Sequence, residues 1–297
     1  KLFYLNNPAC NNGKGAKYGS LIRSSLNKRN VQYDFIQTQS AGHATEIIRN
    51  LDFNIYDAIV LSGGDGTLFE VINGYFLNNS NKRIPIGIIP IGRGNAFARD
   101  LNLFPHKWEE SIDAVLSKKT KMSDVGKCKT ANKSFYFINI LGLGFVTDVA
   151  KTAFTLRRFG HFSYILGVFH RTVSLAPFSL QLECDGNIIE RENVFVEISN
   201  TRYTGKDFLM APEANINDGL FDIVLLNKLS RRRLLQALPK IFNGSHIQMR
   251  ETEYIKARKI KITTNPIKDL TPDGQLLETT PIEIECIHNA VEVFYKE

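Results

Sequence analysis

The chain has 297 residues, of which 43% are apolar and 23% are charged. This is the composition of an ordinary globular protein, and it excludes a disordered chain, a collagen-like chain and a disulfide-rich miniprotein. The length is about twice that of a typical domain, so two domains are expected. With 37 basic and 30 acidic residues, the net charge of +7 favours an anionic partner: a nucleotide, a phospholipid surface or a nucleic acid.

The first 120 residues alternate between strand-like and helix-like segments. We predict strands at Leu2–Asn6, Tyr33–Thr38, Asp57–Leu61 and Ile84–Pro90, and helices at Tyr18–Asn30, Ala41–Asn50, Leu68–Leu77, Asn95–Leu101 and Trp108–Ser117. The third strand is nearly all apolar, as expected where a parallel sheet is covered on both faces. The alternation predicts an open, mainly parallel α/β sheet with right-handed crossovers.

Past Lys121 the pattern changes to short strands, with a hairpin signal at Asp185-Gly186-Asn187. The predicted strands are Phe135–Ile140, Phe178–Cys184, Val194–Ser199, Phe221–Leu226, Lys259–Thr263 and Ile282–Cys286, and the predicted helical segments are Val149–Ser174 and Arg231–Asn243. The second half is therefore predicted to be mostly antiparallel β. We expect domains at residues 1–122 and 123–297, and leave open that the last strand returns to the first domain.

Glycine-rich turns follow three of the predicted parallel strands. Gly63-Gly64-Asp65-Gly66-Thr67 follows the third strand, Gly92-Arg93-Gly94-Asn95 follows the fourth, and Asn7-Pro8 with Asn11–Gly15 follows the first. Glycines let a backbone approach a ligand closely, and a helix N-terminus offers free N–H groups to phosphate. None of the turns is a Walker A loop or a dinucleotide fingerprint. Because neighbouring parallel strands end at one crevice, we predict a phosphate cradle, although Asn11–Gly15 alone reads equally well as a plain tight turn.

These turns resemble those of the diacylglycerol kinase catalytic domain family, which also includes sphingosine and ceramide kinases. The resemblance rests on Gly63–Thr67 and on the run from Pro90 to Arg99, and it continues at Asn139–Phe145, Tyr203–Asp222 and Asp273-Gly274. It covers essentially the whole chain. The first string also occurs in NAD kinases, but the later motifs argue against that group.

The resemblance implies an α/β N-terminal domain of the NAD-kinase and phosphofructokinase type, a β-sandwich C-terminal domain, and an active site in the cleft between them. It implies a kinase that uses ATP and Mg²⁺ and transfers the γ-phosphoryl group to a lipid hydroxyl. Diacylglycerol, giving phosphatidic acid, is the leading acceptor, and a sphingoid base or another lipid is the alternative. The implied nucleotide-binding residues are Asn7, Pro8, Thr38, Gly63, Gly64, Asp65, Gly66, Thr67, Glu70, Gly92, Arg93 and Asn95.

Two aspartates are implied for the chemistry. Asp65 would act on the phosphates, directly or through Mg²⁺, with Glu70 supporting its loop. Asp273 is the candidate acceptor of the lipid hydroxyl proton, which phosphoryl transfer requires. A structural Mg²⁺ site of bacterial members is matched by Asn215, Asp218 and Leu220, where a plain Asn-Asp-Gly turn is the alternative.

Three positions depart from the family pattern. Arg93 stands where the family usually has Thr or Ser, and Ala96 stands where many bacterial members have Asp. Gln275 stands where the family has Glu, and an amide cannot serve as a base. The departures at Arg93 and Gln275 leave open a catalytically impaired regulator that binds nucleotide or lipid. The string shared with NAD kinases leaves open a kinase for a soluble metabolite.

A lipid kinase has to reach a bilayer surface, and Val149–Ser174 mixes aromatic and basic residues that suit an anionic interface or an acceptor pocket. A core-packing helix pair is the equal alternative. No apolar run is long enough to span a bilayer, the chain starts on a strand rather than a signal peptide, and the four cysteines are isolated. We expect a cytoplasmic protein that binds the inner membrane surface transiently, without a nucleic-acid partner; a homodimer is left open.

Overall fold

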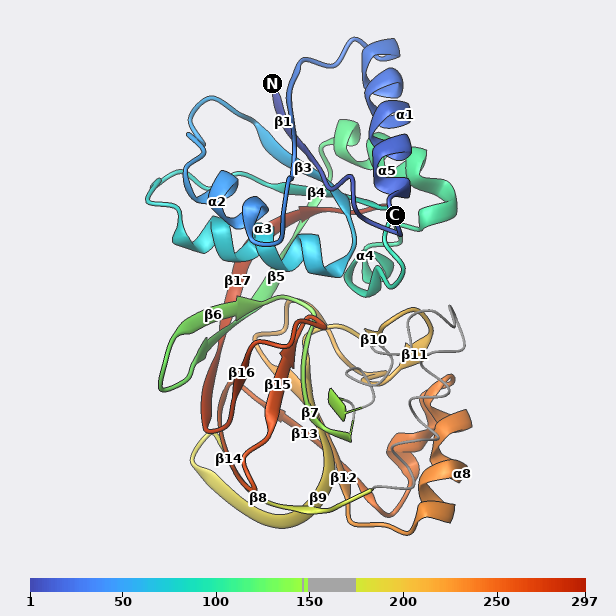
Figure 1. Ribbon diagram of the computed structural model, residues 1–297, viewed down its shortest axis with the longest axis vertical. Coiled ribbons are helices and arrows are strands. Elements are labelled where there is room, and N and C mark those ends of the chain that lie inside the picture. Colours follow the sequence, from blue (N-terminus) through green and yellow to red (C-terminus); the bar gives the residue numbers. More distant parts are fainter. Residues whose placement is uncertain (146, 149–174) are drawn as a thin grey trace.

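The computed structural model describes residues 1–145, 147–148 and 175–297. The predicted helical segment Val149–Ser174 lies outside the described residues. Two units lie one above the other in Figure 1: an α/β unit, coloured blue to green, and below it a unit of mainly antiparallel strands. The predicted fold class is confirmed. In the described part of the chain, no helix combines the length and the apolar character needed to cross a membrane.

Four parallel strands form the N-terminal sheet, in the order β4-β3-β1-β2. Every residue of β3 is buried, because helices cover both faces of the sheet. Since β3 is central, its carboxyl end lies between those of β1 and β4. The strands are β1 (Leu2–Asn6), β2 (Tyr33–Gln37), β3 (Ala58–Gly63) and β4 (Ile86–Pro90).

The helices of this unit pack apolar side chains onto the sheet from both sides. Ile22 of α1 and Ile112 of α5 belong to the core on one face, and Ile48 of α2 and Ile72 of α3 to the core on the other. The helices are α1 (Lys14–Lys28), α2 (His43–Arg49), α3 (Asp65–Leu77), α4 (Ala96–Asp100) and α5 (Trp108–Ser117), with the 3-10 turn η1 (Pro105–Lys107) before α5.

Two helices start earlier than predicted. Helix α1 begins at Lys14, since Gly13 has a φ of 84° and turns the chain directly into the helix. Helix α3 begins at Asp65 instead of Leu68. The Gly63–Thr67 string is therefore the junction of β3 and α3 itself, with Asp65 as the first helical residue.

The C-terminal unit is built from antiparallel strands, with β9 at the centre: it pairs with β7, β8 and β12. Its core includes Phe137, Phe178 and Phe221. The strands are β5 (Thr120–Lys129), β6 (Ser134–Phe137), β7 (Ile140–Gly144), β8 (Phe178–Cys184), β9 (Asn187–Ser199), β10 (Tyr203–Thr204), β11 (Phe208–Leu209), β12 (Phe221–Asn227), β13 (Thr252–Ala257), β14 (Lys259–Asn265), β15 (Asp269–Pro272), β16 (Glu278–Thr279) and β17 (Ile282–Phe294), and the helical segments are α8 (Arg231–Ile241) and η3 (Ser245–Gln248).

Several predicted strands change length. The predicted strand Phe135–Ile140 is divided between β6 and β7. Strand β9 starts at Asn187 rather than Val194, because Asp185 and Gly186 both have positive φ and form a tight turn that returns the chain at once.

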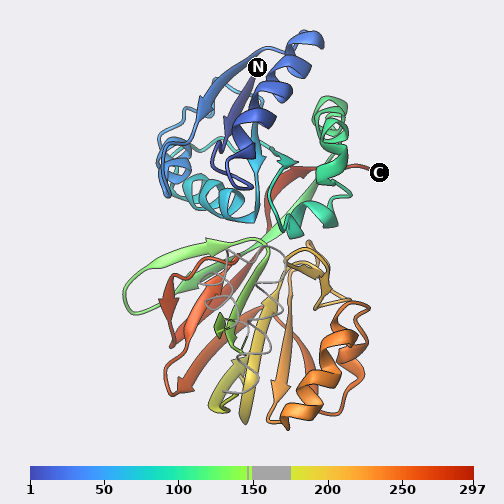
Figure 2. The same cartoon turned by 45° about the vertical axis from the view of Figure 1, so that its right-hand side comes forward.

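Two long strands, β5 and β17, run from one unit to the other, and Figure 2 shows them crossing the junction in green and red. They pair with each other, and Val293 near the end of β17 pairs in parallel with Ile86 of β4. The last strand thus joins the N-terminal sheet. The expected division between residues 122 and 123 falls inside β5 and stays a prediction.

Candidate active site

The two glycine turns after β3 and β4 pack backbone against backbone. The carbonyl of Gly63 accepts from the N–H groups of Ile91 (2.9 Å) and Gly92 (3.1 Å). A Cβ on Gly92 would lie 2.4 Å from the Cα of Gly64, so a side chain there would force the turns apart. Glycine is required at position 92 because the turn after β3 occupies the space of its missing side chain.

The turn after β1 closes the third side. Asn7 Nδ2 donates to the Thr67 hydroxyl (2.9 Å), which ties the end of β1 to the start of α3. The Arg93 guanidinium donates to Asn12 Oδ1 and links the turn after β4 to the turn after β1. Thr38 is buried, and its N–H donates to the carbonyl of Asn6 (3.0 Å). The structure thus brings together three of the turns that the sequence singled out.

Asp65 turns its carboxylate toward the start of α4. Burial raises the pKa of this carboxyl, and the amides of Asn95, Phe97 and Ala96 act in the opposite direction. The N–H of Asn95 donates to Oδ2 at 2.8 Å. Asn95 itself adopts φ 60° and clamps Gly92 with both ends of its side-chain amide. Asp65 therefore holds the second glycine turn in place, at the point where the turns after β3 and β4 meet.

Glu70 lies one turn further along α3, and its contacts lie with α2. Its carboxylate oxygens accept from the N–H groups of Gly42 (2.9 Å) and Ala44 (3.1 Å), and its carbonyl accepts from the Thr45 hydroxyl. These contacts fix the start of α2, just past Thr38, whereas we expected Glu70 to support the Gly63–Thr67 loop. The role of Glu70 in nucleotide binding stays a prediction.

Two segments of the C-terminal unit reach these turns. The Gln275 Nε2 atom lies 2.7 Å from the position that a Cβ on Gly66 would take. The corresponding position on Gly94 lies 2.6 Å from Asp65 Oδ2 and 3.7 Å from the Cα of Gly205. The glycine turns therefore meet the loop after β15 and the β10–β11 hairpin at the junction of the two units.

Asp273 precedes Gln275 by two residues but faces inward. Its carboxylate accepts the N–H groups of Ile138 (3.1 Å), Asn139 (2.9 Å) and Ile140 (3.0 Å). Burial raises its pKa to about 7, against these three hydrogen bonds, and repulsion from Asp65 acts in the same direction as burial. The two aspartates are thus close enough to interact, while the side chain of the loop that reaches the N-terminal unit is Gln275.

A polar clamp between the units was missed by the sequence analysis. Asp100 at the end of α4 accepts from the Arg202 side chain (2.5 Å) and from its N–H (2.9 Å). Arg99 donates to the carbonyl of Lys206 and stacks on the Tyr203 ring at 4.2 Å. The partners are about a hundred positions apart, so no local pattern could reveal them. The clamp holds the β10–β11 hairpin against the second glycine turn.

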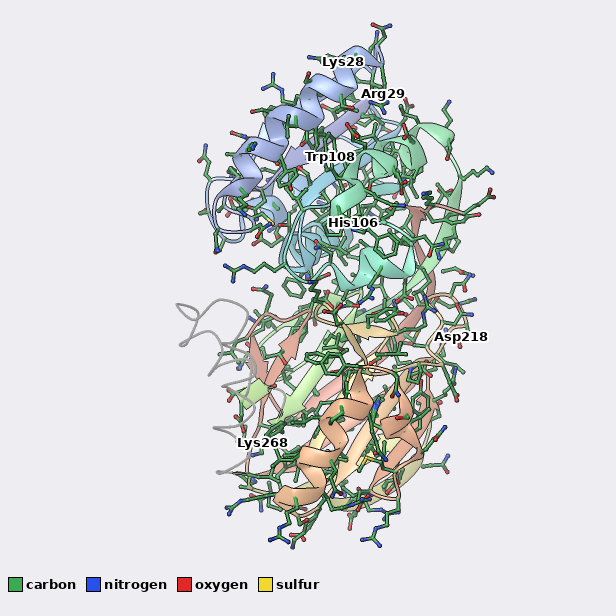
Figure 3. The ribbon with its side chains drawn as sticks, turned by 90° about the vertical axis from the view of Figure 1, so that its right-hand side faces the viewer. Lys28, Arg29, His106, Trp108, Asp218 and Lys268 are labelled. Carbon is green, nitrogen blue, oxygen red and sulfur yellow. The ribbon has the colours of Figure 1, made fainter. Side chains whose placement is uncertain are left out.

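The predicted structural cation residues lie in the loop before β12, and Figure 3 shows Asp218 at the surface of the C-terminal unit. Asp218 Oδ1 accepts from the N–H of Leu220 (3.1 Å), its Oδ2 lies 3.4 Å from Lys256 Nζ, and Asn215 Oδ1 accepts from the N–H of Asn217. Within residues 1–145, 147–148 and 175–297, no group of three or more acidic, His or Cys residues could hold a metal. A cation at Asp218 would have to displace the Lys256 ammonium, and this site stays a prediction.

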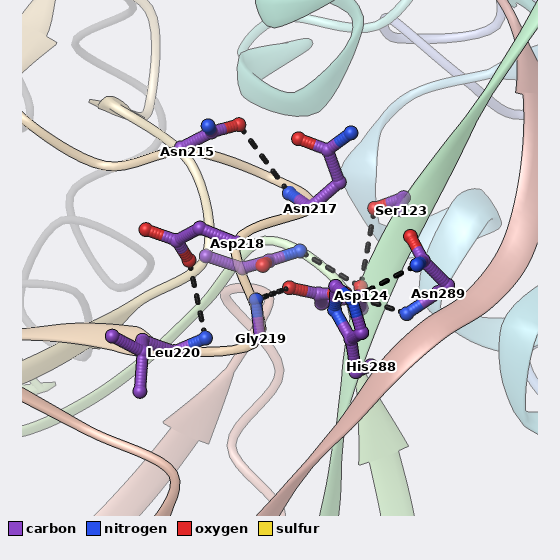
Figure 4. A network of polar contacts seen from close by, with 10 residues as sticks. Ser123, Asp124, Asn215, Asn217, Asp218, Gly219, Leu220, His288 and Asn289 are labelled. Atoms are coloured by element: carbon purple, nitrogen blue, oxygen red, sulfur yellow. Dashed lines mark hydrogen bonds and ion pairs between the residues drawn. The ribbon is translucent and has the colours of Figure 1, made fainter.

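The loop is anchored instead by Asp124, a residue that the sequence analysis did not flag (Figure 4). Its buried carboxylate accepts from the N–H groups of Gly219 and Asn289, both at 2.7 Å, and contacts His288 Nδ1 at 2.9 Å. Because Asp124 lies on β5 and His288 on β17, this network ties the loop to the two strands that join the units.

Comparisons with known proteins extend this picture. Residues 1–128 match the diacylglycerol kinase catalytic domain, and residues 140–295 match the YegS C-terminal NAD kinase beta sandwich-like domain. The chain belongs to the diacylglycerol kinase family. It is therefore a lipid kinase, and as a kinase of this family it uses ATP.

Individual relatives align over most of this kinase. A Bacillus subtilis protein named diacylglycerol kinase is 29% identical over 260 residues, covering 86% of this chain and 83% of the relative. A Mycobacterium tuberculosis protein of the same name is 28% identical over 298 residues, covering 99% and 94%. A solved structure from Bacillus anthracis, described as a candidate diacylglycerol kinase, is similar with a TM-score of 0.84 at 25% identity, covering 100% of this chain and 95% of that one.

Proposed function

We propose that this lipid kinase transfers the γ-phosphoryl group of ATP to the hydroxyl of a membrane lipid, with diacylglycerol as the leading acceptor. The names of the relatives suggest that lipid. The observation that carries the proposal is an apolar cavity of about 380 Å³ in the C-terminal unit, in the range of small-molecule sites. It lies between α8 and strands β9 and β12, and its lining includes Phe145, Phe195, Phe208, Met210, Val224 and Leu238.

The cavity lies next to the glycine turns. Thr204 and Phe208, on the β10–β11 hairpin, line it, and Gly205 of the same hairpin faces Gly94. A lipid whose chains lie in the cavity could thus present its head group at the junction beside Asp65. This arrangement supports a lipid rather than a soluble metabolite as the acceptor.

The roles at the junction follow from chemistry. In the transfer, the lipid oxygen bonds to the γ-phosphorus as the bond to ADP breaks, and positioning and charge neutralisation supply most of the catalysis. Phosphate oxygens with the Asp65 carboxylate would suit Mg²⁺, which prefers oxygen ligands and is bound in kinases by one or two carboxylates. We assign Asp65 to the phosphate edge, with Mg²⁺ brought by the nucleotide.

Asp273 remains the proposed acceptor of the hydroxyl proton. Its pKa of about 7 suits proton transfer near neutral pH. Oδ1 accepts two N–H groups and Oδ2 accepts one, so Oδ2 keeps one lone pair available.

The exposed side chains on and beside helix α8 suit transient binding to a membrane surface. Leu235 is exposed one turn after the exposed Arg231 and Arg232, and Phe242 is exposed just past the other end of the helix, while Leu234 and Ala237 face the cavity. Apolar side chains flanked by arginines suit the interface of a bilayer with anionic lipids. We propose that the protein binds the inner membrane surface peripherally through this side.

The experiment is transfer of label from γ-labelled ATP to lipids in mixed micelles, with Mg²⁺ and with Mg²⁺ chelated. The panel contains diacylglycerol, monoacylglycerol, sphingosine, ceramide and phosphatidylglycerol. A labelled lipid formed only with Mg²⁺ supports the proposal and names the acceptor. Nucleotide binding without transfer to any lipid would contradict it and favour a regulator impaired at Gln275.

A further inference from the structure

One carboxyl group belongs to the wall of the apolar cavity. Glu197 of β9 is completely buried and lines it, together with Phe195 two residues earlier on the same strand face. Its cross-strand neighbours are Gly142 on β7 and Val224 on β12. These two neighbours carry no charge, so neither offers the carboxyl an ion pair.

The two oxygens of this carboxyl differ. Oε1 accepts from the hydroxyls of Thr204 and Ser199 (3.3 Å to Ser199). Oε2 is buried and has no hydrogen-bond partner among the described residues. Burial raises the pKa of Glu197 to about 7, against the two hydroxyl donors. A buried polar atom without a partner carries a desolvation cost that a ligand donor would remove.

The carboxyl lies at the side of the cavity that faces the junction. Thr204, its hydroxyl partner, precedes Gly205, and Gly205 faces Gly94 beside Asp65. A lipid chain in the cavity with its head group at the junction would therefore pass Glu197 close to the head group. Hydrogen-bond donors of lipids are found in that part of the molecule.

We propose that Glu197 is a specificity-determining residue that selects acceptor lipids with a hydrogen-bond donor in addition to the hydroxyl that is phosphorylated. Diacylglycerol has only the reacting hydroxyl, so it would leave Oε2 without a donor. Monoacylglycerol brings a second hydroxyl, and a sphingoid base brings a hydroxyl and an ammonium group. This inference rests on the proposed lipid kinase function and shifts the preferred acceptor within it.

The test compares kcat/KM of the full chain for 1-oleoylglycerol, dioleoylglycerol and sphingosine in mixed micelles. The variants are Glu197→Gln and Glu197→Leu, with Glu190→Gln and Glu190→Leu as matched controls, since Glu190 is exposed on the same strand. In wild type, 1-oleoylglycerol is the better of the two glycerolipids. Both Glu197 variants lose roughly tenfold to a hundredfold toward it and stay within about threefold toward dioleoylglycerol. The controls leave both values unchanged.

The sphingosine arm identifies the donor. A loss toward sphingosine that exceeds the loss toward 1-oleoylglycerol assigns an ammonium group, because a donor with a charge forms the stronger hydrogen bond. Equal losses assign a hydroxyl. Either pattern supports the inference.

The opposing result is a purely structural Glu197. Glu197→Gln, whose amide oxygen still accepts from Thr204, would then behave as wild type with every lipid, and Glu197→Leu would lower all rates alike; this overturns the inference. Retention of tritiated lipids by the chain provides a readout independent of turnover. If wild type phosphorylates no lipid, the proposed function fails. Retention of 1-oleoylglycerol that is about tenfold weaker in Glu197→Gln than in wild type would still support the inference. Equal retention by the two proteins would overturn it.

Discussion

Replacement of Gly94 by alanine tests whether Asp65 and the glycine turns form one catalytic unit. An added Cβ would lie 2.6 Å from Asp65 Oδ2, so the carboxylate has to retreat by about 0.8 Å to reach an ordinary contact of 3.4 Å. Misplacement of a reacting group by about 1 Å can lower a rate roughly a hundredfold. We expect Gly94→Ala to lower kcat/KM for MgATP by one to two orders of magnitude, by the same principle.

The effect on stability should be small, since Gly94 is only half-buried. The control is Gly186→Ala in the β8–β9 hairpin, where an added Cβ meets nothing within 4 Å but φ is +90°. That variant should lose about 1 kcal/mol of stability and no activity. The assay is steady-state transfer with varied MgATP, alongside urea unfolding.

A double-mutant cycle completes the test. In an Asp65→Ala background, Gly94→Ala should cause little further loss, because the displaced carboxylate is already absent. Wild-type kcat and KM in Gly94→Ala, or full additivity of the two substitutions, would refute the reasoning.

Three further predictions concern polar side chains that are buried or that lie at the junction of the two units. Burial raises the pKa of Glu197 to about 7 in the folded protein, so the contribution of this carboxyl to stability is present below about pH 4.5 and is lost as pH rises through 7. Glu197→Gln should therefore be more stable than wild type by up to about 3 kcal/mol at pH 8. At pH 4.5 the two proteins should be about equally stable in urea unfolding. Asp100→Ala should cost about 1–2 kcal/mol by leaving Arg202 unpaired, whereas Lys228→Ala, from an exposed ion pair, should stay within about 0.5 kcal/mol. Gln275→Glu adds a carboxylate at the junction. Because Asp273 is the proposed proton acceptor, kcat should stay within about threefold of wild type; a rise of tenfold or more, the scale of an added general base, would assign proton removal to position 275 instead.

The fold could be predicted from the sequence where local chemistry determines it. The apolar run at β3 predicted the parallel sheet, and the turn glycines predicted the edge of the sheet at which its turns meet. The helix starts were less accurate, since hydrophobic periodicity does not register a first turn such as Asp65–Thr67, where the side chains are small or polar. Strand β17 was predicted too short because its register shifts between Ile287 and Val291, where the apolar alternation breaks.

The site was less predictable, because it depends on contacts between distant segments. The motif resemblance pointed to Asp65 and Asp273, but not to the three amides that hold Asp273 or to the Arg202–Asp100 clamp. Glu197 did have a signal: it is a single charged residue in the otherwise uncharged strand Val194–Ser199. The hydrogen bond from Thr204 to Glu197, which links this carboxyl to the β10–β11 hairpin, is visible only in the folded structure.

The most direct measurement of the central claim is the amount of labelled lipid formed from γ-labelled ATP by wild type and by Asp65→Asn, with nucleotide binding measured on both proteins. Removal of one charge at the meeting point of the turns should lower lipid phosphorylation at least a hundredfold, the scale of one lost electrostatic group in an active site, while the variant remains folded. Equal phosphorylation by both proteins would contradict the claim that the glycine turns and Asp65 form the site of phosphoryl transfer.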